Sequence, residues 1–278
     1  MKLQTNRYGK ARVRVFKKIK KDGLHVPKEL DVKTVLEGGF GDSYTKDDNR
    51  KVIATDSIKN TTNVVAYNQL GTETEPFALV LCEHYLKKYS HVTSVHVETL
   101  ERVWERQIVE GKPSGTNFIS SGKGIPWTQT VATRDSIETA SGIRELVLLK
   151  TSGSAWEDFL RDDLATLPDA NDRLLATSLT ARWVYQKAPA SYATANANII
   201  QAMLEAFSTR FSPSVQSTQY HMGEAALNAC PEIIQISLTM PNLHYLVIDL
   251  TPFNIQNDKE LFVPTEAPQG WIEATVAR

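Results

Sequence analysis

The order of the predicted elements repeats along the chain, and this repetition restricts the possible folds more than any other feature. Two strands, two helices and two strands are predicted before about residue 138, and the same order is predicted after it. Consecutive strands outnumber strand–helix–strand alternations, so the pattern favours antiparallel pairing and the α+β class. We therefore expect two similar ββααββ domains, 1–138 and 139–278, that share one continuous antiparallel sheet.

The first half opens with a predicted hairpin. Valine and arginine alternate in Arg12–Phe16, and the alternation of apolar and polar residues resumes over Leu30–Leu36. Between these two runs, Asp22-Gly23 is typical of a tight turn. An apolar strand tip, Val52-Ile53-Ala54, then leads into a predicted helix at Thr55-Asp56-Ser57, whose side chains are good N-caps.

Apolar residues spaced three and four apart predict the remaining helices. They occur over Phe77–Lys88, Tyr192–Phe207 and the segment from Pro213 to Pro231. Further strands are predicted at Val95–Ile108, Gly142–Lys150, Leu179–Tyr185, Ile233–Leu238 and Leu243–Leu250.

Charge and composition exclude several classes of protein. The 278 residues are 41% hydrophobic, with 31 basic and 32 acidic side chains, so a core is available and a basic surface for nucleic acid is not expected. Two cysteines, Cys82 and Cys230, cannot build a disulfide framework and suit a reducing compartment. No run approaches the ~18 apolar residues of a membrane span. Without a predicted signal peptide or peroxisomal tripeptide, we expect a cytoplasmic protein.

Common cofactor motifs are incomplete in this sequence. Gly38-Gly39-Phe40-Gly41 lacks the third glycine of a dinucleotide fingerprint, and Ser121-Gly122-Lys123-Gly124 lacks the flanking residues of a P-loop. Thr151–Ala155 lacks the two glycines that flank a nucleophilic serine at an elbow. A turn is the simpler interpretation of Gly38–Gly41, and none of the three segments indicates a bound cofactor.

One group of residues raises the question of a metal. Cys82, His84, His91 and His96 fall within fifteen residues, and all four are natural zinc ligands. No pair among them has the i,i+4 or C-x-x-C spacing that puts ligands on one face of an element. We therefore expect ordinary helix and strand positions and no metal.

Five short stretches together carry a resemblance to a known family. They are Arg7–Lys10, Val52–Thr61, Phe159–Asp162, Ser214–Thr218 and Pro241–Tyr245, and in this order the set resembles urate oxidase (uricase) over nearly the whole chain. The resemblance implies two tandem tunnelling-fold (T-fold) domains and a homotetrameric barrel with active sites between subunits. It also implies oxidation of urate by O₂ to 5-hydroxyisourate and hydrogen peroxide in purine catabolism, without metal or organic cofactor.

The resemblance implies that seven residues bind the substrate: Thr55, Asp56, Trp156, Arg173, Val215, Gln216 and Asn242. Arg173 matches the family's clamp, because a guanidinium fork can hold one edge of a planar, anionic oxopurine with two parallel bonds. The Gln216 amide offers a donor and an acceptor for the opposite edge, and the backbone N–H of Val215 is a further donor. Asp56 lies at a helix N-terminus, where free N–H groups favour an anion, and Trp156 stands where the family commonly has a stacking phenylalanine. Without the resemblance, a surface arginine near a helix start is the simpler interpretation of Arg173.

The proton relay is also carried over from the family. Lys10 would be the base, Thr55 would pass the proton and contact O₂ or water, and His244 would extend the relay. Asn242 would hold O₂ or water above the purine. An extended strand would put Asn242 and His244 on one face, followed by Leu246, Ile248 and Leu250, so His244 could instead be a core histidine. Lys10 shares strand parity with Arg12 and Arg14, so an exposed basic face is its simpler interpretation.

Two departures from the family pattern leave alternatives open. Trp156 replaces phenylalanine, and Asp158 replaces a glycine, which affects the local turn. The alternatives are another T-fold purine or pterin enzyme, such as a zinc cyclohydrolase or pterin synthase, and a non-catalytic purine binder.

Overall fold

The computed structural model of this chain describes residues 1–265 and 267–278. The helices are α1 (Gly41–Thr45), α2 (Thr55–Gln69), α3 (Glu75–Lys88), α4 (Tyr192–Thr209) and α5 (Val215–Ala229). The strands are β1 (Arg7–Lys21), β2 (Leu24–Gly38), β3 (Val92–Arg102), β4 (Trp104–Val109), β5 (Lys112–Ser120), β6 (Ile125–Thr133), β7 (Ile137–Lys150), β8 (Leu175–Tyr185), β9 (Ile233–Thr239), β10 (Asn242–Leu243), β11 (Tyr245–Val247), β12 (Phe262–Pro264) and β13 (Glu273–Ala277). In the described residues, no helix combines the length and apolar character that crossing a bilayer requires.

The chain divides into two compact units that interleave along the sequence. The first contains residues 1–142 and 184–194, and the second contains residues 143–183 and 195–278. Strands β7 and β8 each supply residues to both units. The division of the two repeats at residue 138 stays a prediction.

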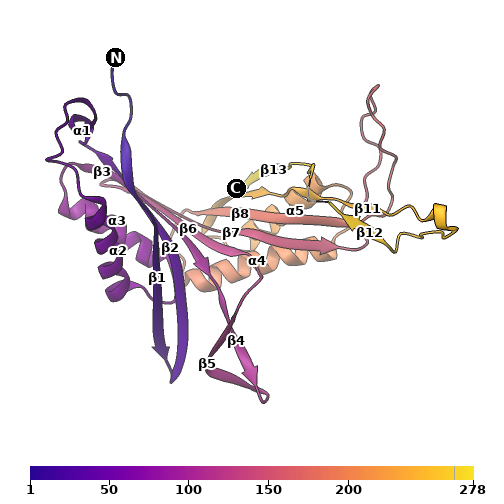
Figure 1. The fold of residues 1–278 in the computed structure, drawn as a ribbon, viewed down its shortest axis with the longest axis horizontal. Coiled ribbons are helices and arrows are strands. Elements are labelled where there is room, and N and C mark those ends of the chain that lie inside the picture. The colour runs from indigo at the N-terminus through magenta and orange to yellow at the C-terminus, as the bar shows by residue number, and fades with distance from the viewer. Residues whose placement is uncertain (266) are drawn as a thin grey trace. The chain divides into compact units, whose positions relative to one another are not determined.

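The first unit is an antiparallel sheet with two helices packed on it. Its strands follow the order β1-β2-β3-β6, and Figure 1 shows α2 and α3 lying along them. Leu30, Val32 and Leu36 of β2 are at most 1% exposed because they alternate toward the helices. The predicted hairpin is confirmed: Asp22 and Gly23 both have positive φ, 50° and 77°, as the twist of a two-residue turn requires.

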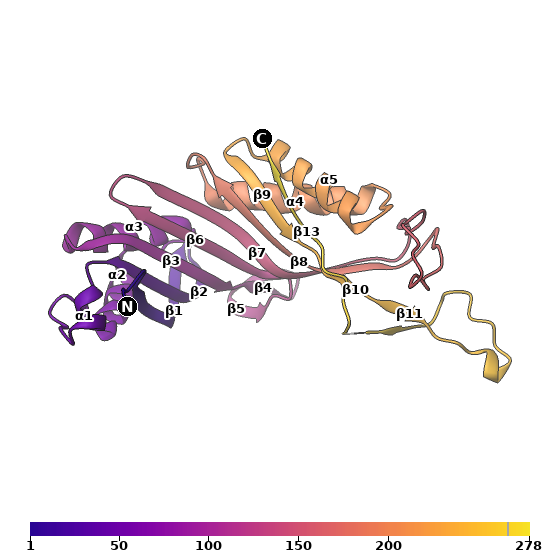
Figure 2. The same cartoon turned by 90° about the horizontal axis from the view of Figure 1, so that it is seen from above.

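The second unit repeats this arrangement with α4 and α5. Strand β8 lies between β7 and β9, β13 pairs antiparallel with β9, and Figure 2 shows α4 and α5 beside these strands. Both predicted helices are confirmed. Every fourth residue of α4 is buried, which gives it the apolar stripe that packs on the sheet: Ala195, Ile199, Met203 and Phe207.

The prediction of one continuous strand over Leu243–Leu250 is wrong. Asn242 and Leu243 pair with β8, but from Tyr245 the chain pairs with β12 instead. The change of partner occurs at His244, whose carbonyl accepts from the N–H of Thr265 at 2.9 Å and from its hydroxyl at 3.2 Å. The single apolar face expected beyond His244 therefore does not form, and Leu246 is 54% exposed.

Candidate active site

A cavity in the second unit brings together five of the residues predicted to bind substrate or O₂. It has a volume of about 170 Å³ and is lined by Trp156, Leu167, Arg173, Val215, Gln216, Asn242, Gly270 and Ile272. Four separate stretches of sequence supply these residues, so the cavity exists only in the folded chain. The remaining lining residues, Leu167, Gly270 and Ile272, were not predicted from the sequence.

Arg173 presents an unpaired cation to this cavity. Its backbone N–H donates to the Ser154 carbonyl at 2.8 Å, and its Nε donates to the Ala155 carbonyl at 3.3 Å. Among residues 1–265 and 267–278, no carboxylate forms an ion pair with the guanidinium, although Asp172 is its neighbour in sequence. Burial lowers the pKa of Arg173 from its ordinary value. A half-buried guanidinium without a counter-ion favours an anionic ligand.

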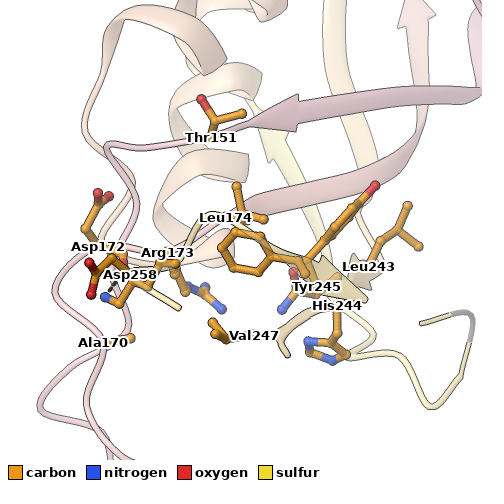
Figure 3. A pocket seen from close by; sticks show the side chains of 13 residues that line it. Thr151, Ala170, Asp172, Arg173, Leu174, Leu243, His244, Tyr245, Val247 and Asp258 are labelled. Carbon is orange, nitrogen blue, oxygen red and sulfur yellow. Dashed lines mark hydrogen bonds between the residues drawn. The ribbon is translucent and has the colours of Figure 1, made fainter. Parts of the chain in front are cut away.

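The carboxylate of Asp172 is held by other groups. It accepts from the Ser152 hydroxyl and from the Gly153 N–H, both at 2.9 Å. These bonds keep the pKa of Asp172 below its ordinary value. Figure 3, which draws a neighbouring cavity that Arg173 also lines, shows the Asp172 and Arg173 side chains pointing apart.

The N-terminus of α5 forms another part of the cavity wall. Ser214 caps the helix by accepting from the Ser217 N–H at 3.0 Å. This cap leaves the N–H groups of Val215 and Gln216 among those that have no partner within the helix. Val215 is buried and Gln216 is exposed, so a backbone donor and a side-chain amide lie together at a helix end that favours negative charge.

Trp156 provides an aromatic wall. Its ring is parallel to that of Phe159, with centroids 5.5 Å apart and planes 11° apart, and the guanidinium of Arg161 lies 4.5 Å from the Phe159 centroid. The backbone of Trp156 pairs with that of Ala170, which closes the loop that carries this stack. Asp158 has φ 55°, a left-handed conformation in which glycine meets no Cβ penalty. The turn thus keeps a conformation that suits the glycine of the family pattern.

Asn242 and His244 lie at the edge of the same region. Asn242 is 8% exposed, and its backbone N–H donates to Gly270 at 2.8 Å. A second cavity of about 400 Å³ is lined by Arg173, Asn242 and His244 among others, so Arg173 and Asn242 border both cavities. His244 is half-buried and lines this cavity, so it is not a fully buried core histidine.

Lys10 belongs to the first unit, and a β-bulge determines its direction. Lys10 pairs with Thr34 and Val13 pairs with Val32, so β1 has one extra residue between these two pairs. Arg12, in this bulge, has φ 57°. Directly opposed residues share a face, so Lys10 lies on the helix-covered face with Val13 and not on the face of Arg12 and Arg14. The exposed basic face is therefore wrong as an interpretation of Lys10.

Thr55 and Asp56 lie at the start of α2, also in the first unit. Both are exposed, and the N-cap residue Ala54 provides no side-chain cap. The Asp56 carboxylate accepts from Lys59 at 2.6 Å and from Asn60 at 2.9 Å. The Lys59 bond is the main cause that lowers the pKa of Asp56, and Lys10 is close enough to add to the effect. The first N–H groups of α2 are then the donors that remain for a ligand.

The four candidate zinc ligands do not come together. Cys82 contacts the carbonyls of Val95 and Thr130, and burial raises the pKa of its thiol to about 12. The ring of His91 bonds to the Lys51 carbonyl, and the ring of His96 lies 3.1 Å from Glu37. Throughout the described part of the chain, no three His, Cys, Asp or Glu side chains form a group suited to a metal ion. The alternative with a zinc site at these residues is therefore not supported.

Fold and site together define an α+β protein whose second unit has a cavity lined by the Arg173 guanidinium, the N-terminus of α5 and the Trp156 side chain. Comparison with known proteins identifies the family. The uricase family model matches residues 6–131 and 139–273, two tandem segments that span nearly the whole chain. The chain belongs to the uricase family.

Individual relatives agree with this assignment. The chain is 36% identical to a uricase of Cyberlindnera jadinii, over 99% of this chain and 97% of the relative. It is 34% identical to a uricase of Arthrobacter globiformis, over 99% of this chain and 90% of the relative. The crystal structure of uricase from Arthrobacter globiformis matches with a TM-score of 0.95 and 32% identity, over 100% of this chain and 95% of that chain.

Proposed function

We propose that the protein is a urate oxidase that converts urate, O₂ and water to 5-hydroxyisourate and hydrogen peroxide without a metal or organic cofactor. The observation that carries this proposal is the unpaired, half-buried guanidinium of Arg173 in one cavity with the Gln216 amide and the Trp156 indole. Urate is flat and anionic, and its edges alternate N–H and C=O groups. A cation fork, an amide and an aromatic face together complement such a molecule.

In the proposed mechanism, Arg173 and Gln216 hold opposite edges of the purine. The backbone N–H of Val215 adds a donor, and Trp156 stacks on the ring. Asn242 holds O₂ or water above the purine. The cavity orients the reactants and excludes bulk water from the oxidised intermediates.

The same proposal gives Lys10, Thr55 and His244 the proton transfers. Lys10 accepts a proton from urate through the Thr55 hydroxyl, which can both donate and accept, and His244 extends the relay. The N–H groups at Thr55 and Asp56 receive the anion at the start of α2.

We propose that these groups meet in a homotetramer, with each active site between two subunits. Thr55 and Asp56 are exposed in the single chain, as expected for residues that a second subunit covers. A cytoplasmic location also stays a prediction, and it agrees with the two free, buried cysteines, Cys82 and Cys230.

The experiment is a turnover assay on extensively chelated protein with urate in air. We expect urate absorbance to fall while hydrogen peroxide accumulates in equal amount. Full inhibition by the chelator, reversed by added zinc, would contradict the cofactor-independent reaction. Retention of urate on the immobilised protein without peroxide would instead indicate a non-catalytic purine binder.

A further inference from the structure

The hydroxyl of Tyr8 joins strand β1 to the segment that precedes α2. The backbone N–H of Ile53 donates to the Tyr8 Oη at 2.7 Å, and this hydroxyl donates to the Ile53 carbonyl at 3.1 Å. One side chain thus satisfies both backbone groups of one residue, 45 positions away in sequence. Only a protonated hydroxyl can accept and donate in this way.

Ile53 lies two residues before Thr55, the first residue of α2. The N-cap residue Ala54 has no side chain that can cap the helix, whereas Ser214 caps the corresponding helix α5. The start of α2 therefore has no side-chain cap of its own. The hydrogen bonds from Tyr8 are the contact that holds the residue just before this N-cap.

Tyr8 and Lys10 share one face of β1. Tyr8 pairs with Leu36 and Lys10 pairs with Thr34, and alternate residues of a strand point the same way. The residue between them, Gly9, packs directly against the backbone of β2, because a Cβ at this position would lie 1.9 Å from the Thr34 carbonyl oxygen. The Tyr8 side chain therefore reaches Ile53 from the strand segment that also carries Lys10.

We propose that Tyr8 is a positioning residue that holds Thr55 and Asp56 in register with Lys10 by fixing the backbone of Ile53. The inference rests on the proposed function of Lys10 and Thr55 and adds a residue to it. A proton relay is sensitive to the spacing of its members, and a misplacement of about 1 Å can lower a rate by about 100-fold. Tyr8 acts through the backbone and does not itself touch substrate.

The surroundings of Tyr8 keep its ring in place and its hydroxyl protonated. The edge of one ring meets the face of the other in the Tyr8–Phe40 pair, with centroids 4.7 Å apart and planes 90° apart. Burial raises the pKa of Tyr8 from its ordinary value. Both effects favour the state in which the hydroxyl donates and accepts at once.

The test compares Tyr8→Phe with Tyr85→Phe in the full-length protein. Tyr85 also donates from its hydroxyl to a backbone carbonyl of α2, that of Ile58 at 3.3 Å, but one turn further along the helix. We expect Tyr8→Phe to lower kcat about 10- to 100-fold with KM unchanged within about twofold. Tyr85→Phe should lose thermal stability without this selective loss of kcat. Amide hydrogen exchange at Ile53 should quicken in Tyr8→Phe alone.

Several outcomes would overturn the proposal. A wild-type kcat in Tyr8→Phe would do so, and so would equal losses of kcat in the two variants, because a merely structural role predicts the latter. If Tyr8→Phe does not fold, 4-aminophenylalanine at position 8 keeps a donor for the Ile53 carbonyl, and its kcat should lie below that of the wild type. A wild-type enzyme without urate turnover would refute the proposed function, and the exchange rate at Ile53 would still test the positioning contact.

Discussion

Asp172 and Arg173 are neighbours in sequence that do not neutralise each other. The Asp172 carboxylate accepts two bonds of 2.9 Å from the turn at Ser152 and Gly153. The Arg173 guanidinium lines a cavity, and among the described residues no carboxylate forms an ion pair with it. The Asp172 carboxylate stabilises the turn, and the Arg173 guanidinium stays without a counter-ion among the described residues.

Replacing Arg173 by lysine should separate charge from geometry. Lysine keeps the positive charge but cannot form two parallel bonds, so Arg173→Lys should weaken urate binding by about 2 kcal/mol, or about 30-fold. Isothermal titration with the urate analogue 8-azaxanthine measures this loss. The exposed Arg210→Lys is the matched control and should bind as the wild type does. Equal affinity in all three proteins would refute the clamp.

Lys10→Met should reduce turnover far more than binding. The methionine keeps the length of the side chain but cannot accept a proton, and loss of a general base lowers rates by about 100- to 10,000-fold. We expect kcat to fall by this factor while KM changes little. Steady-state kinetics over a range of pH provide the measurement, with the exposed Lys18→Met as control. Unchanged kcat and KM would remove Lys10 from the mechanism.

Gly9→Ala should destabilise the protein and also lower its activity. The added Cβ would lie 1.9 Å from the Thr34 carbonyl oxygen and 2.8 Å from the Val35 Cα, both backbone atoms that cannot easily move. Such overpacking costs about 1–3 kcal/mol or more. Urea unfolding should show this loss for Gly9→Ala and little change for Gly71→Ala, whose Cβ would meet nothing within 4 Å. Equal stability of the two variants would contradict the close approach of the strands.

The contribution of Asp172 to the stability of the protein should be present near neutral pH and lost in acid. Its pKa in the folded state lies below the ordinary value of 3.8, because it accepts from the Ser152 hydroxyl and the Gly153 N–H. The stabilisation is therefore complete above the unfolded pKa and is lost as pH falls through the folded pKa. Asp172→Asn should lower Tm near neutral pH, and the difference from wild type should shrink as the pH drops below 3.8. A difference in Tm that does not change with pH would contradict this role.

Much of the fold follows from local pattern. The alternation in β1 and β2, the Asp22-Gly23 turn and the apolar stripes of the helices are local properties of the chain, and the structure confirms them. Strand β6 and the short strands β12 and β13 were not predicted. Their pairing joins segments far apart in sequence, so local periodicity carries little signal for it.

Prediction of the candidate site from sequence is limited in the same way, because its geometry also depends on segments far apart in the chain. The resemblance named Trp156, Arg173, Val215, Gln216 and Asn242, and the structure brings all five to one cavity, while their roles stay predictions. Two geometric features could not be predicted. One is the bulge that moves Lys10 off the face of Arg12 and Arg14, because a single extra residue reverses strand parity without altering the hydrophobic pattern after it. The other is the change of strand partner at His244, which depends on the distant Thr265.

The extra residue in β1 also determines which changes of chain length the enzyme can tolerate. Two residues lie between Lys10 and Val13 on one strand, whereas one lies between Val32 and Thr34 on the other. A deletion of Arg12 would leave an evenly paired strand with Lys10 still opposite Thr34. An insertion at the same place would need a second bulge or would rotate Lys10 to the opposite side of the sheet. Shortening β1 at this place therefore preserves the side of the sheet on which Lys10 lies, whereas lengthening β1 can reverse it.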